Sequence, residues 1–485
     1  MTKLGNLVKD SSIYAVGSVL NRLGAFLLLP LYTNYLTAAE YGAMELFYSV
    51  AAVVSSILGV GLAHAALRFY FEYDKQSDRN AVISTCVVVT AIISALGLVT
   101  IFSIRETVVS LLFENDAYER VLVVLLVSTF FELSSQVYFA YIRAIEKPVL
   151  FVGITLVKLL LQIALNTLFL VFNEEGLEGA IKANASAVFL GWVMLFSYTT
   201  FRCGLSFHIN KMREILSYSL PFLYSSIVGV VYANMDRFVI NAMIGVEALG
   251  IYALALKMAQ LIQALVGEPF SKAYGAYRFS IMKQADAGQV QNRALVLVLA
   301  IATFVGGGIV VFVAPVIELL SAPVFFQAAY FVPLLVLMYV LKIFVYTAQT
   351  GILVHKKTFE IFKISLTTLV VSFISHVVFG YLFDVWGICT AQLLTTLVAG
   401  MMTHRVSLRY FHVTYEFTQI GKLLAVFSFV VAANLLMPEW GLVTELLYKA
   451  TIVLFSLVFL WRGSFIDEQA KQLIVGKISS ISSRG

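Results

Sequence analysis

The sequence has little charge, little proline and little cysteine. Only 13% of its 485 residues are charged and 60% are hydrophobic, whereas about 25% of the residues in an average soluble domain are charged. No soluble core hides so much apolar surface, and a mean hydropathy of +0.90 is too high for a globular protein with a single membrane anchor. Most of the chain is therefore expected to lie in lipid.

The scarce residue types also exclude several kinds of chemistry. Cys86, Cys203 and Cys389 lie far apart in or beside apolar runs, so they predict neither disulfides nor a metal site, and no cofactor is expected. Basic residues do not alternate with aromatic residues as nucleic-acid binding requires, which argues against a nucleic-acid partner. The sequence shows no Ser/His/Asp set, Gly-rich phosphate loop or paired-carboxylate motif, so we do not expect an enzyme.

Long apolar runs are what the chain has in abundance. About fourteen stretches of roughly 20 residues are bounded by charged or turn residues, and each is long enough for one transmembrane helix. Their limits are 11–32, 42–66, 81–102, 121–142, 149–171, 179–201, 217–240, 249–270, 294–314, 328–353, 361–383, 385–406, 420–437 and 442–461. The linkers are too short for a soluble domain. We predict an all-α polytopic membrane protein with about 14 transmembrane helices.

The basic residues outside these spans fall mostly in alternate loops. The loops of the opposite side hold only Arg105 and Arg120 as basic residues, together with several acidic residues. Positively charged loops stay on the cytoplasmic side, so both termini are expected to be cytoplasmic.

An internal repeat divides the predicted helices into two halves. Without gaps, residues 35–46 (YLTAAEYGAMEL) align with residues 243–254 (MIGVEALGIYAL), so that Gly42 matches Gly250. A polar linker at 202–216 separates the halves, and an offset of six helices relates them by an axis along the membrane normal, as in two-lobed transporters. We predict lobes at 1–205 (helices 1–6) and 206–410 (helices 7–12), followed by helices 13 and 14 and a cytoplasmic tail at 411–485.

Some basic residues fall inside the predicted spans, where each costs at least about 2.5–3.5 kcal/mol unless it faces protein or water. They are Arg22, Lys158, Lys182, Arg237, Lys257, Lys342 and Lys449. Several share helix faces with Ser, Thr, Asn, Gln or Tyr. We interpret these stripes of uncompensated cations as the lining of a water-filled, net positive cavity. Lys182 and Lys449, close to the membrane surface, are instead expected to snorkel.

Three acidic residues also lie within the spans, namely Glu45, Glu132 and Asp236. Glu132 has no obvious partner in the sequence and is a candidate for coupling transport to protons or another cation. Asp236 is a second candidate, although a salt bridge with Lys257 on the next helix explains it equally well. His376 also falls within a span, where a histidine more often belongs to a hydrogen-bonded structure.

Two motifs resemble bacterial polysaccharide flippases of the multidrug/oligosaccharidyl-lipid/polysaccharide exporter superfamily. The first is the loop 36–42 (LTAAEYG), which follows a helix containing Asn21-Arg22 and ending in residues 29–32 (LPLY). The second combines residues 236–240 (DRFVI), Ile244-Gly245 and residues 249–252 (LGIY). Members of this family export O-antigen, capsule or related repeat units.

The resemblance implies a flippase that moves undecaprenyl-diphosphate-linked oligosaccharide from the cytoplasmic to the outer leaflet of the bacterial inner membrane by alternating access. A diphosphate fits a cationic cavity, and arginine binds phosphate in a bidentate manner. The expected headgroup contacts are Arg22, Arg237, Lys158, Lys257 and Lys342, with Arg68 at the cytoplasmic end of helix 2.

Besides the lipid-linked oligosaccharide, the expected partners are membrane lipids and other membrane proteins of polysaccharide assembly. A lipid II flippase and a multidrug antiporter of the same superfamily remain alternatives. A membrane enzyme of polysaccharide assembly is the alternative from another class, although the longest outer linker, 103–120, is too short for a folded domain.

Overall fold

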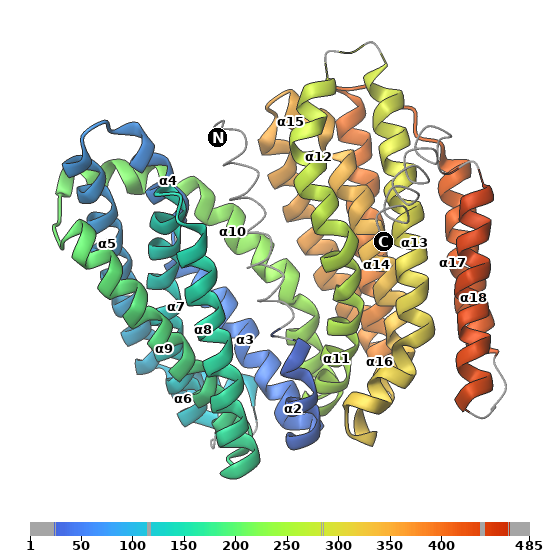
Figure 1. Ribbon diagram of the computed structural model, residues 1–485, viewed down its shortest axis with the longest axis horizontal. Coiled ribbons are helices and arrows are strands. Elements are labelled where there is room, and N and C mark those ends of the chain that lie inside the picture. The colour runs from blue at the N-terminus through green and yellow to red at the C-terminus, as the bar shows by residue number, and fades with distance from the viewer. Residues whose placement is uncertain are drawn as a thin grey trace, which may run out of the picture. The chain divides into compact units, whose positions relative to one another are not determined.

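The computed structural model describes residues 24, 26–113, 118–282, 284, 286–436, 442–463 and 465 (Figure 1). All regular secondary structure in this part of the chain is helical. Residue contacts divide the chain into two compact units. The first unit consists of Met1–Gly250 with Leu320–Ala322, and the second unit of Ile251–Leu319 with Pro323–Gly485.

The first unit is a bundle in which α7 occupies a central place. Its helices are α2 (Leu29–Tyr35), α3 (Ala38–Leu58), α4 (Leu62–Glu72), α5 (Gln76–Ser103), α6 (Arg105–Leu112), α7 (Glu119–Ala144), α8 (Pro148–Asn166), α9 (Gly176–Cys203) and α10 (Ile209–Met243). α7 packs against α4, α5 and α9, while α10 packs against α3 and α4. Apolar side chains of α4, α5 and α7, among them Phe69, Cys86 and Tyr138, form the core.

The second unit contains most of α11 (Val246–Ile262) and the remaining helices. These are α12 (Glu268–Ile281), α13 (Ala287–Leu320), α14 (Ala328–Ala348), α15 (Thr350–Val354), α16 (Thr358–Leu408), α17 (Phe417–Leu435) and α18 (Leu442–Arg462). A π-helical turn, Gln263–Gly267, joins α11 to α12, and a similar turn, Thr167–Phe172, extends α8 in the first unit.

The predicted fold class is confirmed. Among the described residues, 11 helical segments are long and apolar enough to cross a membrane, or up to 12 with the bent α10. α16 is 51 residues long and breaks at Phe383 and Asp384, where Asp384 has φ 49°, so it supplies both spans expected at 361–383 and 385–406. The first expected span lies mostly outside the described residues, and the remaining spans match the prediction. The chain is a multi-pass membrane protein.

The breaks within spans follow local backbone chemistry. α3 and α4 form one span, Ala38–Glu72, which is interrupted where Gly61 adopts φ 66°, a left-handed conformation that suits glycine. α10 bends by 46° between Leu220 and Leu223. The sequence has Pro221 at this bend, and proline removes a helical hydrogen bond.

The motif at residues 36–42 has a structural explanation. Thr37 caps the N-terminus of α3: its Oγ1 accepts a hydrogen bond from the Glu40 backbone N–H at 3.2 Å, and the Glu40 carboxylate accepts from the Thr37 backbone N–H at 2.9 Å. This reciprocal capping box satisfies two backbone donors at the start of a helix. Tyr41 follows and is fully buried, so the motif fixes where α3 begins.

Gly42 and Gly250, which the internal repeat aligns, contact each other's helices in the first unit. A Cβ on Gly42 would lie 1.9 Å from the Val246 carbonyl oxygen, and a Cβ on Gly250 would lie 2.0 Å from the Ala38 carbonyl oxygen. The contact is reciprocal, because each glycine meets the residue four positions before the other. Only glycine permits this approach of α3 and α11.

The contact-based division differs from the predicted lobe limits in the placement of α10. The predicted boundary falls at 205/206, whereas the first unit extends to Gly250 and includes all of α10. The predicted lobes at 1–205, 206–410 and 411–485 describe bodies that move during transport, so they stay a prediction.

Candidate substrate-binding face

The first unit brings together two residues that the sequence analysis assigned to different roles. The Lys158 Nζ on α8 lies 2.8 Å from the Glu132 Oε2 on α7. Both residues lie near the middle of their helical spans, Pro148–Phe172 and Glu119–Ala144. The Glu132 side chain is 45% exposed and the Lys158 side chain 26% exposed, so this ion pair is accessible at membrane depth.

Further polar groups continue from this ion pair in both directions. On α7, Gln136 and Arg143 are exposed and share the Glu132 face by helical spacing. On α8, Gln162 lies one turn beyond Lys158, and its Nε2 donates a hydrogen bond to the Asn184 Oδ1 of α9 at 3.1 Å. We call Glu132, Gln136, Lys158, Gln162 and Asn184 the polar face of the first unit.

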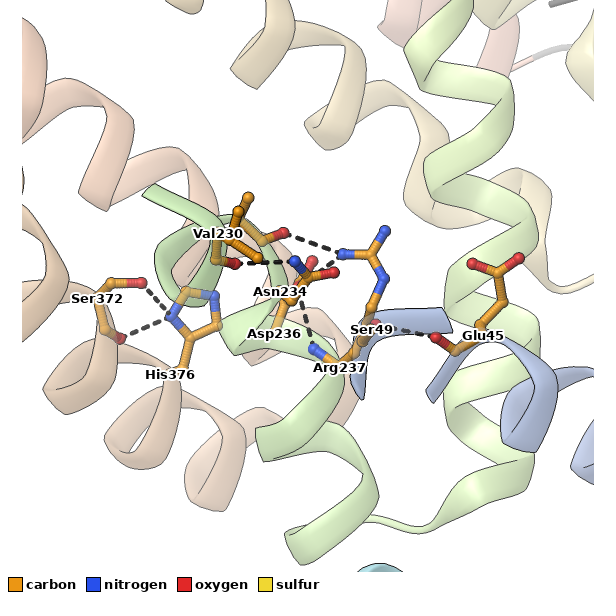
Figure 2. Close-up of polar contacts among 9 residues, drawn as sticks. Glu45, Ser49, Val230, Asn234, Asp236, Arg237, Ser372 and His376 are labelled. Carbon is orange, nitrogen blue, oxygen red and sulfur yellow. Dashed lines mark hydrogen bonds and ion pairs between the residues drawn. The ribbon is translucent and has the colours of Figure 1, made fainter. Parts of the chain in front are cut away.

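A second ion pair in the first unit has a different environment. The Arg237 Nη1 lies 3.0 Å from the Asp236 Oδ1, and the Arg237 backbone N–H also donates to this oxygen at 2.9 Å. The Asp236 side chain is only 1% exposed and the Arg237 side chain 12% exposed. Figure 2 shows both residues with Asn234 on α10, and Glu45 with Ser49 on α3. This pair lies within α10 and is largely buried.

These two pairs correct part of the sequence interpretation. The expectation of uncompensated cations is wrong for Lys158 and Arg237, because each has a carboxylate within 3.0 Å. Glu132 likewise has a partner, which the sequence concealed because 26 residues separate it from Lys158. The salt bridge that was expected between Asp236 and Lys257 would join the first unit to the second. It stays a prediction, as the alternative to a coupling role for Asp236.

Lys182 and Lys449 both have carboxylate partners close by in the sequence. The Lys182 side chain is 39% exposed, whereas the Lys449 side chain is only 3% exposed, so the structure does not show the expected snorkelling for Lys449. The Lys182 Nζ lies 2.9 Å from a Glu175 oxygen and 3.0 Å from a Glu178 oxygen near the start of α9. The Lys449 Nζ lies 2.5 Å from a Glu445 oxygen one turn away on α18. Local carboxylates therefore account for both cations.

The remaining predicted substrate contacts lie on another helix of the first unit, in the second unit or outside the described residues. Arg68 on α4 is exposed; its guanidinium lies 4.2 Å from the ring centroid of Tyr218 and 3.9 Å from a Glu72 oxygen. In the second unit, Lys257 is half-buried on α11, and the Lys342 Nζ lies 4.7 Å from the Tyr339 ring centroid on α14. Arg22 lies outside the described residues.

His376 belongs to a hydrogen-bonded structure in the second unit. Its side chain is fully buried, and its Nδ1 lies 2.6 Å from the Ser372 carbonyl oxygen and 3.2 Å from the Ser372 Oγ, as the dashed lines in Figure 2 show. A carbonyl oxygen only accepts, so the Nδ1 carries the proton of this contact. The structural interpretation of this histidine therefore fits its surroundings.

Sequence reasoning missed two polar residues. Asn184 lies opposite Gln162, but no stripe of polar residues on α9 marks it in the sequence. Arg278 lies beyond the predicted span 249–270, where a basic residue is typical of an exposed loop, yet it is only 7% exposed, and its Nη2 donates to the Tyr346 hydroxyl at 3.0 Å. Nothing in the sequence around Arg278 signals its burial.

Two solved structures of membrane proteins have a similar fold. The chain is similar to the lipid II flippase MurJ in an inward closed conformation, with a TM-score of 0.73 and 13% identity over 93% of this chain and 98% of that one. It is also similar to an inward-facing multidrug resistance MATE family transporter of the MOP superfamily, with a TM-score of 0.60 and 16% identity over 83% and 96%. At these identities the likeness concerns the fold alone.

The family is shown by sequence. Residues 7–274 match the family model of polysaccharide biosynthesis proteins, so the chain belongs to this family. Two relatives from Haemophilus influenzae are similar over more than half of the chain. An uncharacterized membrane protein is 23% identical over 292 residues, 58% of this chain and 67% of the relative. Lsg locus putative protein 1 is 22% identical over 277 residues, 57% of this chain and 67% of the relative.

Proposed function

We propose that the protein is a flippase that moves undecaprenyl-diphosphate-linked oligosaccharide repeat units from the cytoplasmic to the outer leaflet of a bacterial inner membrane. The observation that carries the proposal is membership of the polysaccharide biosynthesis family across more than half of the chain. The fold supports transport, because the similar solved structures include a lipid II flippase and MATE transporters.

The polar face supplies groups that suit such a substrate. A lysine at mid-membrane depth attracts a diphosphate, and side-chain amides bind sugar hydroxyls through one donor group and one acceptor oxygen each. Lys158 is accordingly a substrate contact and Glu132 a coupling residue in the proposal. Arg22, Arg237, Lys257, Lys342 and Arg68 remain proposed headgroup contacts, and Asp236 a proposed coupling residue.

A lipid II flippase is the second candidate, favoured by the TM-score of 0.73 to MurJ. The substrates of both candidate functions contain undecaprenyl diphosphate, so the chemistry of the polar face does not distinguish the two functions. They differ in the sugar, which is a peptidoglycan precursor in one case and a polysaccharide repeat unit in the other.

The experiment that tests the proposal is to delete the gene and determine the structures of the lipid-linked sugars that accumulate. A flippase for repeat units should leave complete repeat units on undecaprenyl diphosphate, together with loss of surface polysaccharide. Accumulation of lipid II would favour the second candidate. Accumulation of an incomplete unit would instead indicate a membrane enzyme of assembly, and an unchanged lipid-linked pool would contradict the proposal.

A further inference from the structure

The Glu132–Lys158 pair is unusual because it is accessible at the middle of two membrane spans. The two side chains are 45% and 26% exposed, whereas Asp236 in the other pair is 1% exposed. Hydrocarbon does not solvate a carboxylate or an ammonium group, so accessible charges at this depth face water or a polar ligand. The accessible space beside Glu132 is therefore polar.

The lipid-facing side of α8 lies opposite this pair. Val149, Leu156 and Leu160 are exposed apolar residues that fall together on one face of α8 by helical spacing. Lys158 and Gln162 lie on the other face, where Gln162 reaches Asn184 of α9. The polar face thus points away from the apolar side that suits the hydrocarbon.

The hydrogen bond between Gln162 and Asn184 leaves hydrogen-bonding groups for a ligand. It uses the Gln162 Nε2 as donor and the Asn184 Oδ1 as acceptor. The Gln162 Oε1 and the Asn184 NH2 group each retain hydrogen-bonding capacity, and neither side chain is fully buried. A donor and an acceptor therefore lie side by side, one helical turn beyond the Lys158 cation, which matches a phosphate followed by a hydroxylated sugar.

We propose that Glu132 is a resident counter-ion of Lys158, which the phosphate of the substrate displaces, while Gln162 and Asn184 bind the first sugar. This inference rests on the proposed function and adds a mechanism of loading and release to it. When the site is empty, the Glu132 carboxylate stabilises the lysine charge at membrane depth. When the substrate enters, its phosphate replaces the carboxylate, and the return of Glu132 promotes release.

This arrangement predicts opposite effects of Glu132 on binding and on transport. Because Glu132 competes with the phosphate, Glu132→Gln should tighten binding about fivefold, as expected from removing a partly exposed ion pair. The same change should slow transport, because the phosphate is no longer displaced. A purely structural role for Glu132 would not produce tighter binding together with slower transport.

The experiment measures binding of undecaprenyl diphosphate to the full-length protein in lipid nanodiscs by native mass spectrometry. Lys158→Met should weaken binding about tenfold or more, because a charge-assisted contact is lost, and the double variant with Glu132→Gln should bind like Lys158→Met. Gly153→Ala is the matched control on α8, because a Cβ there would meet no atom within 4 Å. It should bind like the wild type.

The outcomes separate this inference from the proposed function. Equal or weaker binding by a folded Glu132→Gln variant, with the wild type binding well, would overturn the exchange mechanism alone. If Glu132→Gln does not insert, Glu132→Asp should tighten binding in the same direction by a smaller factor, and weaker binding by that variant would also overturn the mechanism. A wild-type protein that does not bind the probe would count against both.

Discussion

Two ion pairs in the first unit have the same chemistry but different surroundings. Asp236 and Arg237 are adjacent on α10, and their side chains are 1% and 12% exposed. Glu132 and Lys158 lie on different helices, and their side chains are 45% and 26% exposed. A buried pair within one helix leaves a ligand little access to its charges, whereas an accessible pair between two helices exchanges partners readily. Accessibility, more than charge, therefore decides how readily each pair can exchange its partner for a ligand.

We expect the largest difference in the free energy of unfolding when the carboxylate of each pair is replaced by an amide. Asp236→Asn leaves a mostly buried guanidinium without its neighbouring carboxylate, and breaking one side of a buried pair costs about 3–5 kcal/mol. Glu132→Gln leaves an ammonium that water reaches, so it should cost less than about 1 kcal/mol. Thermal unfolding of both purified variants checks the comparison. Equal losses of stability would show that the two pairs do not differ as described.

An intermediate effect is expected where Gly42 of α3 meets the first turn of α11. Gly42→Val places a side chain against the Val246 carbonyl, where even a Cβ would lie 1.9 Å away. Such crowding should cost about 1–3 kcal/mol. Gly229→Ala on α10 is the matched control, because a Cβ there would meet no atom within 4 Å. Unfolding temperatures that fall equally for both variants would contradict the close contact.

The smallest effect is expected for a third pair, at the membrane surface. The Lys182 ammonium, helped by Asn173, lowers the pKa of the Glu175 carboxyl below its usual range. A lowered pKa adds stability above the ordinary carboxyl pKa, and this contribution is lost as the pH falls through the lowered value. Glu175→Gln should therefore destabilise by less than about 1 kcal/mol at pH 7.

The pH dependence of unfolding checks this third pair. The difference between wild type and Glu175→Gln should be present near neutral pH and vanish in acid, below the lowered pKa. A difference that grows as the pH falls would contradict the assigned sign. The expected result would show that an exposed pair at the membrane surface stabilises the protein as weakly as the accessible pair at mid-membrane depth.

Much of the fold follows from the sequence, because apolar run length alone determines where a membrane helix fits. The break at Asp384 in α16 falls where the predicted spans 361–383 and 385–406 meet. The break between α3 and α4 falls at Gly61, which has φ 66°. The internal repeat aligned Gly42 with Gly250, and the structure places these glycines in reciprocal contact.

The candidate site was less predictable, because partners on different helices depend on packing. Helical spacing placed Lys158 and Gln162 on one face but gave no sign that α7 and α9 bring Glu132 and Asn184 to them. Arg278 is the opposite case, because a basic residue beyond a predicted span is typical of an exposed loop, yet Arg278 is buried against Tyr346. A single sequence does not show which side chains of different helices lie next to each other.

The most direct test of transport is the transbilayer movement of the lipid-linked oligosaccharide that accumulates in the deletion strain, in proteoliposomes containing the purified protein. We expect the wild type to move the labelled lipid much faster than protein-free liposomes. Glu132→Gln should move it more slowly and Lys158→Met scarcely at all. Movement at the protein-free rate with the wild type would contradict the account.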